Sequence, residues 1–229
     1  MTRQIVTIPR HMTLTDNVDW DIDWRGQSAR ESNSGASVAV INAFPRWVGS
    51  PTLNLHGANV LLWRALRLQV QGRVGLYRIT MQDPRAVSLC ADFGIVSGTY
   101  ESGIPYSTGY RHSTGVGFFF EPFVTTSAAA VAGASSITVD AGTGPTPTVG
   151  QIMSYDDRPF SVVNVIPVSG TIWTLEIQMP LRSAIPASAE ILHIGRGIFE
   201  TVDASAGNPA YEWNRPSRPR LNLQEYLGR

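Results

Sequence analysis

The sequence predicts a mainly β protein with three parts. These are a β-sandwich-like N-terminal domain containing one helix, a small β-barrel or sandwich module, and an extended C-terminal tail. Three observations predict this class. Apolar residues make up 43% of the 229 residues, which is enough for a core. The 21 glycines and 15 prolines favour turns over long helices. Short apolar segments also recur with the two-residue period of strands.

The N-terminal segments carry the clearest strand signals. Residues 4–8 and 12–24 are expected to be strands. In the second segment, three aspartates alternate with the apolar residues Val18, Trp20, Ile22 and Trp24. Strict alternation is typical of a half-buried strand. A more apolar strand is expected at 38–44, ended by Pro45-Arg46-Trp47.

One segment, residues 57–71, has helical periodicity. Val60, Trp63 and Val70 recur at helical spacing with Leu66 between them. The same stripe is expected to be widened by Leu61, Ala65 and Leu68. Gly72 stands where a helix C-cap would be, and residues 74–81 are expected to follow as a strand.

The middle of the chain changes character. Residues 94–117 are rich in Gly, Ser, Thr and Tyr, which predicts a long loop or a bent hairpin, and such segments are usually functional. The apolar run that follows is either an ordinary core strand or an interface strand; it contains Phe118, Phe119, Phe120 and Phe123.

The second half predicts a small β module. Small, turn-rich residues mark a composition change at 128–147, and evenly spaced short strands are expected at 137–139, 151–155, 159–166, 172–178 and 190–194. Turns are expected at Asp156-Asp157-Arg158-Pro159 and at Ser169-Gly170. We therefore assign residues 1–123 to the N-terminal domain, completed by 196–208, residues 124–195 to the module and 209–229 to the tail.

The tail is proline-rich but carries apolar anchors, namely Tyr211, Trp213, Leu221, Leu223 and Tyr226. A disordered tail would be poorer in aromatic residues. We therefore expect it to lie either on its own domain or on a neighbouring subunit.

Charge and composition exclude several classes of protein. Eighteen basic and eighteen acidic residues give no net charge, which argues against binding nucleic acid through phosphates. Every cation is arginine, which reflects either codon usage or a preference for ordered interfaces. Cys90 is the only cysteine and is expected to be a buried thiol. No apolar run suits a signal peptide or a membrane span, so the chain is expected to be made and kept in the cytoplasm.

Catalytic and metal-binding motifs were sought without success. The chain has no lysine for a phosphate loop, and its four histidines are far apart. Asp19, Asp21 and Asp23 fail as a calcium loop because Trp24 and Arg30 occupy the Gly and Glu positions. Nothing fixes the separation of Glu101 and Glu121, a conceivable glycosidase pair. We expect no catalytic, cofactor or metal residues, and hence no enzyme.

Two stretches resemble known proteins. Phe44-Pro45-Arg46-Trp47, the helix with Trp63-Arg64-Ala65-Leu66, residues 71–79 and Asp83-Pro84 look like the N-terminal domain of siphophage distal tail and minor tail proteins. Residues 128–194 are similar to a β-rich module of phage tail proteins, with Val149-Gly150-Gln151, Arg158-Pro159-Phe160 and Met179-Pro180-Leu181-Arg182. Gln151 and Met179 depart from the acidic residue and the proline of that pattern.

The resemblance covers about half of the chain, and it implies a structural subunit of the virion. It implies a ring, often a hexamer, between the tail tube and the hub or tip, with receptor-binding proteins as further partners. The expected interface residues are the phenylalanine run, the tail anchors and three tyrosines of the 94–117 segment, Tyr100, Tyr106 and Tyr110. Neither a membrane nor sequence-specific nucleic acid is an expected partner.

Three other functions stay open at this point. A carbohydrate-binding or host-attachment module would present Trp173 or the tyrosines of 100–110 in a row. A tail-associated hydrolase would gather carboxylates or histidines in a cleft. A capsid-stabilising or neck protein would share the same β-rich assembly.

Overall fold

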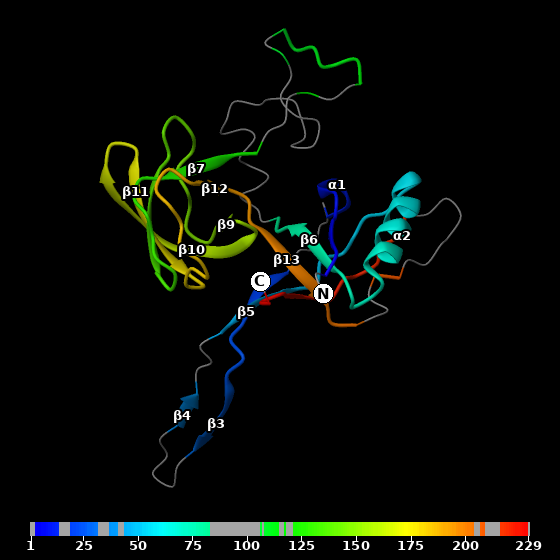
Figure 1. Cartoon of the computed structure of the whole chain (residues 1–229), viewed down its shortest axis with the longest axis horizontal. Helices are drawn as coiled ribbons and strands as arrows, with labels where there is room; N and C mark the ends of the chain where they lie inside the picture. Colours follow the sequence, from blue (N-terminus) through cyan, green and yellow to red (C-terminus); the bar gives the residue numbers. More distant parts are fainter. Residues whose placement is uncertain are drawn as a thin grey trace. The chain divides into compact units, whose positions relative to one another are not determined.

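The computed structural model describes residues 3–13, 19–31, 37–40, 44–82, 106, 108–114, 117, 121–203, 207–208 and 216–228. The chain divides into two units. Unit 1 consists of residues 1–6, 15–77 and 199–229, and unit 2 of residues 7–14 and 78–198. The described residues are mainly β, which confirms the predicted class (Figure 1).

A six-stranded sheet has the order β1-β6-β13-β14-β5-β2. Its strands are β1 (Ile5–Thr7), β6 (Leu76–Thr80), β13 (Arg196–Thr201), β14 (Leu223–Glu225), β5 (Arg46–Gly49) and β2 (Trp20–Asp23). The division between the units falls within β1, β6 and β13. Two helices are described, α1 (Arg10–Thr13) and α2 (Ala58–Val70).

Two predictions about strand bounds in the first 50 residues are wrong. The segment 12–24 is not one strand, because α1 occupies its start and β2 only its end. Pro9 accepts the amide of Met12, so the chain enters a helical turn there. Pro45 does not end a strand but precedes β5, a position that a proline tolerates because it needs no ladder donor.

Unit 1 is organised around the inner side of α2. Trp63 is fully buried, its ring stacks on Tyr77 with centroids 5.8 Å apart, and its Nε1 donates to the Gly207 carbonyl at 2.8 Å. Gly207 has φ +72°, and a Cβ there would lie 2.4 Å from Leu221 Cδ2. Glycine therefore lets this loop approach the tryptophan closely. The predicted helix at 57–71 is confirmed within a residue at each end.

Burial of the Tyr77 phenol gives a testable titration. Desolvation raises the pKa of Tyr77 to about 12, although the charge of Arg67 opposes the rise. The neutral phenol is therefore favoured in the folded chain, and its contribution to stability is present below pH 10 and lost as the pH rises through 12. An ultraviolet titration of phenolate should show one late-ionising tyrosine, and Tyr77→Phe should remove that phase. A titration in which Tyr77→Phe changes only the early phase would contradict this assignment.

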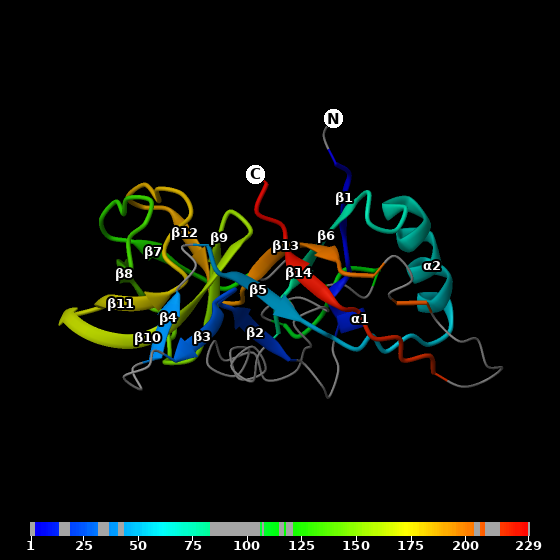
Figure 2. The same ribbon diagram turned by 90° about the horizontal axis from the view of Figure 1, so that it is seen from below.

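Unit 2 contains a closed barrel of order β10-β11-β8-β7-β12-β9. Its strands are β7 (Phe123–Thr126), β8 (Ser136–Asp140), β9 (Ile152–Tyr155), β10 (Arg158–Ser169), β11 (Ile172–Gln178) and β12 (Glu190–Leu192). Alternate residues such as Ile137, Val139, Leu175 and Ile177 are buried. These strands lie close to those expected between 137 and 194. Of the two alternatives for the module, barrel or sandwich, the barrel is the one found (Figure 2).

The turn between β9 and β10 is anchored by charge. Asp156 and Asp157 have φ values of 49° and 57°, as in a tight two-residue hairpin turn, and Arg158 pairs with Tyr155. The Asp157 side chain is only 8% exposed. Its two oxygens accept from Arg78 Nε at 2.9 Å and from Arg196 Nε, and Arg196 also contacts Glu121 at 3.0 Å. All of these residues belong to unit 2.

Candidate subunit interface

The outer side of α2 is unusually apolar for a surface helix. Leu61 and Leu68 are 68% and 69% exposed, and Leu62 is also exposed. At 100° per residue, Leu61, Ala65 and Leu68 point in nearly one direction, opposite to Trp63 and Val70. We call these three residues the outer face of α2.

This arrangement corrects one expectation about the helix. Leu61, Ala65 and Leu68 do not widen the core stripe, because they lie on the exposed side while Trp63 and Val70 are the buried residues of α2. A helix that is apolar on both sides is typical of a helix buried on both sides. The outer face therefore has the composition of a surface that another polypeptide covers.

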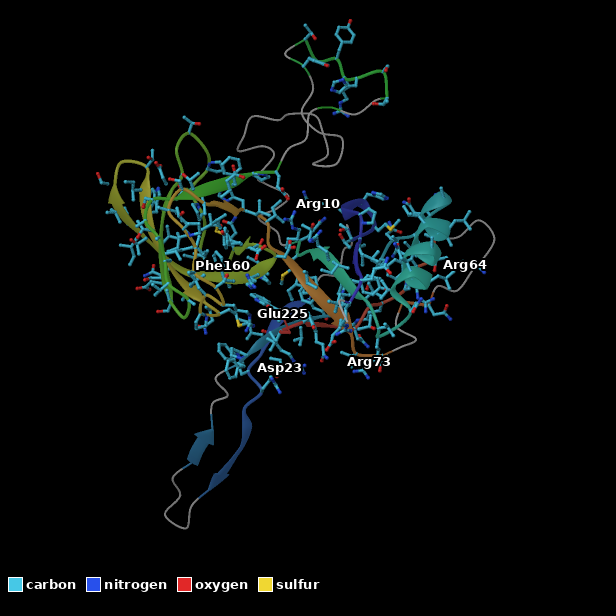
Figure 3. The ribbon with its side chains drawn as sticks, in the orientation of Figure 1. Arg10, Asp23, Arg64, Arg73, Phe160 and Glu225 are labelled. Carbon is cyan, nitrogen blue, oxygen red and sulfur yellow. The ribbon has the colours of Figure 1, made fainter. Side chains whose placement is uncertain are left out.

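The charged side chains of α2 and of the turn that follows it are all arginines. Arg64 lies on the outer side of α2, and Arg73 follows the helix (Figure 3). Arg67 donates to Asn208 Oδ1 at 3.0 Å. No acidic residue occurs in α2. The helix thus combines exposed leucines with cations, a composition that favours a partner bearing carboxylates.

A second feature of unit 1 is a two-stranded ribbon formed by β3 (Gln27–Glu31) and β4 (Ser37–Val40). It pairs Gln27 with Val40 and Glu31 with Ser37, and it forms a sheet of its own (Figure 1). A two-stranded hairpin is marginally stable alone, and its open edges are sites for further strand pairing. The ribbon is thus a second element suited to contact with another chain.

The base of the ribbon carries two exposed aromatic residues. Trp24 follows β2 and is 48% exposed, and Phe44 precedes β5 and is 64% exposed. β2 is the edge strand of the six-stranded sheet, and Asp23 at its end pairs with Arg46 at 3.2 Å. We call Asp21, Asp23, Trp24 and Phe44 the β2 end. Large exposed aromatics are common at interface centres.

Six of the predicted interface residues lie outside the described residues, namely Tyr100, Phe118, Phe119, Phe120, Tyr211 and Trp213. The structure places three others at the surface. Tyr106 and Tyr110 are exposed, and the Tyr106 hydroxyl lies 3.1 Å from His112 Nδ1. Phe123 at the start of β7 is 43% exposed. An interface role for these three residues stays a prediction.

The remaining tail residues pack within unit 1. Leu221 and Leu223 are buried, and β14 pairs with β13 on one side and β5 on the other. These two leucines therefore dock on their own domain, which is one of the two alternatives expected for the tail. Tyr226 is half-buried, with the Arg3 guanidinium 4.9 Å from its ring centroid.

A shallow hollow opens at the barrel between the start of β7 and the loop after β8. Its volume is about 430 Å³, and it is lined by Phe123, Thr125, Asp140 and Gly142 among others. A hydrogen bond from the Thr171 side chain, and a second from the Gly142 amide, lower the pKa of Asp140. Glu121, which also lines the hollow, is bonded to Arg196.

The described residues give little support to the hydrolase and carbohydrate-binding alternatives. Glu101, the proposed glycosidase partner of Glu121, lies outside the described residues. Trp173 is half-buried and pairs with Pro167 in the β10–β11 hairpin, away from Tyr106 and Tyr110 in the sequence. Within the described ranges, no group of three or more His, Cys, Asp or Glu side chains is placed to hold a metal ion.

A scan against protein-family models finds no match, and a search of curated proteins finds none either. Among the helices described, none is long and apolar enough to cross a membrane.

Sequence reasoning missed the residues that matter most in these surfaces. The helical period predicts Leu61 and Leu68 in the core stripe, and the alternation predicts Trp24 on the buried face of a strand. A signal was present in the helix, since its apolar residues occupy nearly its whole circumference and its only charged residues are arginines. Phe44 was noted only as part of a motif.

Proposed function

We propose that this protein is a structural subunit of a bacteriophage tail, a distal tail or baseplate protein that oligomerises into a ring. In the virion the ring joins the tail tube to the hub or tip and docks neighbouring tail proteins. The subunit performs no catalysis in this role. One observation carries the proposal: α2 buries Trp63 on one side and exposes Leu61 and Leu68 on the other.

The energetics of the outer face support permanent association. Covering a leucine that is two-thirds exposed stabilises a complex by about 1–2 kcal/mol. Permanent interfaces resemble a core cut in half, and the outer face has that composition. The β3–β4 ribbon supports the same proposal, because a hairpin of this kind gains stability from a partner strand. The place in the virion is supported by the resemblance of residues 44–84 and 128–194 to tail proteins.

The first test is the mass of the purified chain. Light scattering after gel filtration should give a mass near six times the 24.9 kDa of one chain, and negative-stain images should show rings. The Leu61→Glu/Leu68→Glu variant should shift the mass to that of a single chain, because each new carboxylate would be buried in the contact. Val131→Glu is the matched control, since Val131 is a 73% exposed apolar residue of the barrel.

Two results would contradict the proposal. One is a wild-type chain that stays at the mass of one chain at all concentrations tested. The other is a double-glutamate variant that keeps the wild-type mass. On purified particles, antibody labelling should mark the distal end of the tail, and labelling at the neck or capsid would instead favour the capsid-stabilising alternative.

A further inference from the structure

We propose that the ring is built head to tail, with the outer face of α2 in one copy docked on the β2 end of the next. This inference rests on the proposed function, because it names the partner surface of the same oligomer. The occupant of the outer face is thus a second copy of this chain.

Charge complementarity is the first argument. Residues 58–73 contain three arginines and no acid, and residues 19–23 contain three aspartates and no base. Asp19 pairs with Arg220 at 2.7 Å and Asp23 with Arg46. Asp21 is exposed, and its Oδ1 accepts only the adjacent Ile22 amide among the described contacts. Arg64 makes no ion pair within the described part of the chain, whereas the charge of Arg73 acts on Glu200. Asp21 is therefore the carboxylate best placed to receive a cation from outside.

The apolar parts match as well. The register pairs Asp23 with Arg46, so Trp24 and Phe44 stand at neighbouring strand ends, and both are exposed. Aromatic rings are efficient anchors because they bury a large area with few rotatable bonds. Docked on α2, they would cover Leu61 and Leu68, and Arg64 could stack on a ring face. Both apolar surfaces would then be removed from water in one contact.

The places of the two surfaces in unit 1 require a heterologous contact. α2 packs on Tyr77 of β6, whereas β2 is the far edge strand, beyond β13, β14 and β5 in the sheet order. Figure 2 shows the labelled strands β2 and β5 apart from α2 within this unit. Within one copy, the outer face of α2 cannot dock on the β2 end. Each copy therefore docks its outer face on one neighbour and its β2 end on the other. Repeated contacts of this kind close into a ring if the rotation allows.

A symmetric contact between two α2 helices is disfavoured by the same charges. It would place Arg64 of one copy near the arginines of the other without a carboxylate between them. Like charges across an interface cost affinity and suppress the wrong pairing. The arginine-bearing outer face thus favours the aspartate-bearing β2 end over itself.

A charge exchange tests the pairing in the full-length chain. Arg64→Asp and Asp21→Arg should each weaken self-association by about tenfold or more, because each places like charges together. The double variant Arg64→Asp/Asp21→Arg should regain the wild-type mass, since every contact again joins opposite charges. An equimolar mixture of the two single variants should also assemble, with the variants alternating around the ring. Glu190→Arg, an exposed carboxylate of the barrel, is the matched control.

The outcomes separate this inference from the proposed function. If Asp21→Arg keeps the wild-type mass, the β2 end is not the partner surface and the inference is overturned. It is equally overturned if both single variants fail to assemble and neither the mixture nor the double variant restores the ring. In either case the effect of the Leu61→Glu/Leu68→Glu variant still decides the proposed function. Circular dichroism and thermal melting confirm that each variant is folded.

Discussion

Replacing Trp63 with alanine is expected to lower the free energy of unfolding by about 3–5 kcal/mol. The side chain is fully buried, stacks on Tyr77 and donates to the Gly207 carbonyl, so the substitution leaves a cavity and an unsatisfied acceptor. Urea unfolding followed by circular dichroism measures the loss. The same substitution should abolish assembly only indirectly, by unfolding unit 1.

Leu61→Ala is the control on the opposite side of the same helix. In the isolated subunit it should change the unfolding free energy by less than about 0.5 kcal/mol, because the side chain is two-thirds exposed. Its effect should instead fall on assembly. Equal losses of monomer stability for Trp63→Ala and Leu61→Ala would show that α2 has no distinct inner and outer sides.

The second large effect is expected in the barrel, where Asp157→Asn should destabilise unit 2 by about 2–4 kcal/mol. Asparagine tolerates the positive φ of this turn position, so the loss measures the ion pairs rather than the turn. Without the carboxylate, Arg78 and Arg196 lose a shared acceptor that is nearly buried. Both arginines are about one-third exposed, so water recovers part of the loss.

Asp156→Asn provides the comparison within the same turn. Its carboxylate is 66% exposed and pairs with Arg158 at the surface, so the change should cost less than about 1 kcal/mol. Hydrogen exchange of the β9 and β10 amides separates the two variants from effects on unit 1. If Asp156→Asn were the more damaging change, the anchoring role of Asp157 would be wrong.

Periodicity predicted the barrel well because its strands are short, regular and closed by local turns. The β9–β10 hairpin is an example, since the Asp156-Asp157 pair between two apolar runs predicts a tight turn. The same reasoning failed for the expected strand at 12–24, because its first residues belong to α1 and only the alternating residues near its end form β2. Alternation cannot show where a strand starts when a short helical turn precedes it.

The candidate interface was harder to predict, for a physical reason. A leucine gives the same hydrophobic pattern in the sequence whether it packs in the core of its own subunit or against another subunit. In α2 the buried residues Trp63 and Val70 lie a few positions from the exposed Leu61 and Leu68, and only the packing of Trp63 on Tyr77 shows which side of the helix faces inward. The tail posed the opposite problem. Leu221 and Leu223 are apolar enough to lie on a neighbouring subunit, but they are buried in their own unit.

The position of β14 between β13 and β5 has a consequence for biosynthesis. Its residues leave the ribosome after the whole barrel, yet they join strands that include some of the earliest in the chain. Unit 1 therefore depends on contacts between segments far apart in sequence, which form slowly. A nascent or prematurely terminated chain lacks this interior strand, so its unit 1 stays incomplete. A complete unit 1 would then be restricted to chains that have been translated through Glu225.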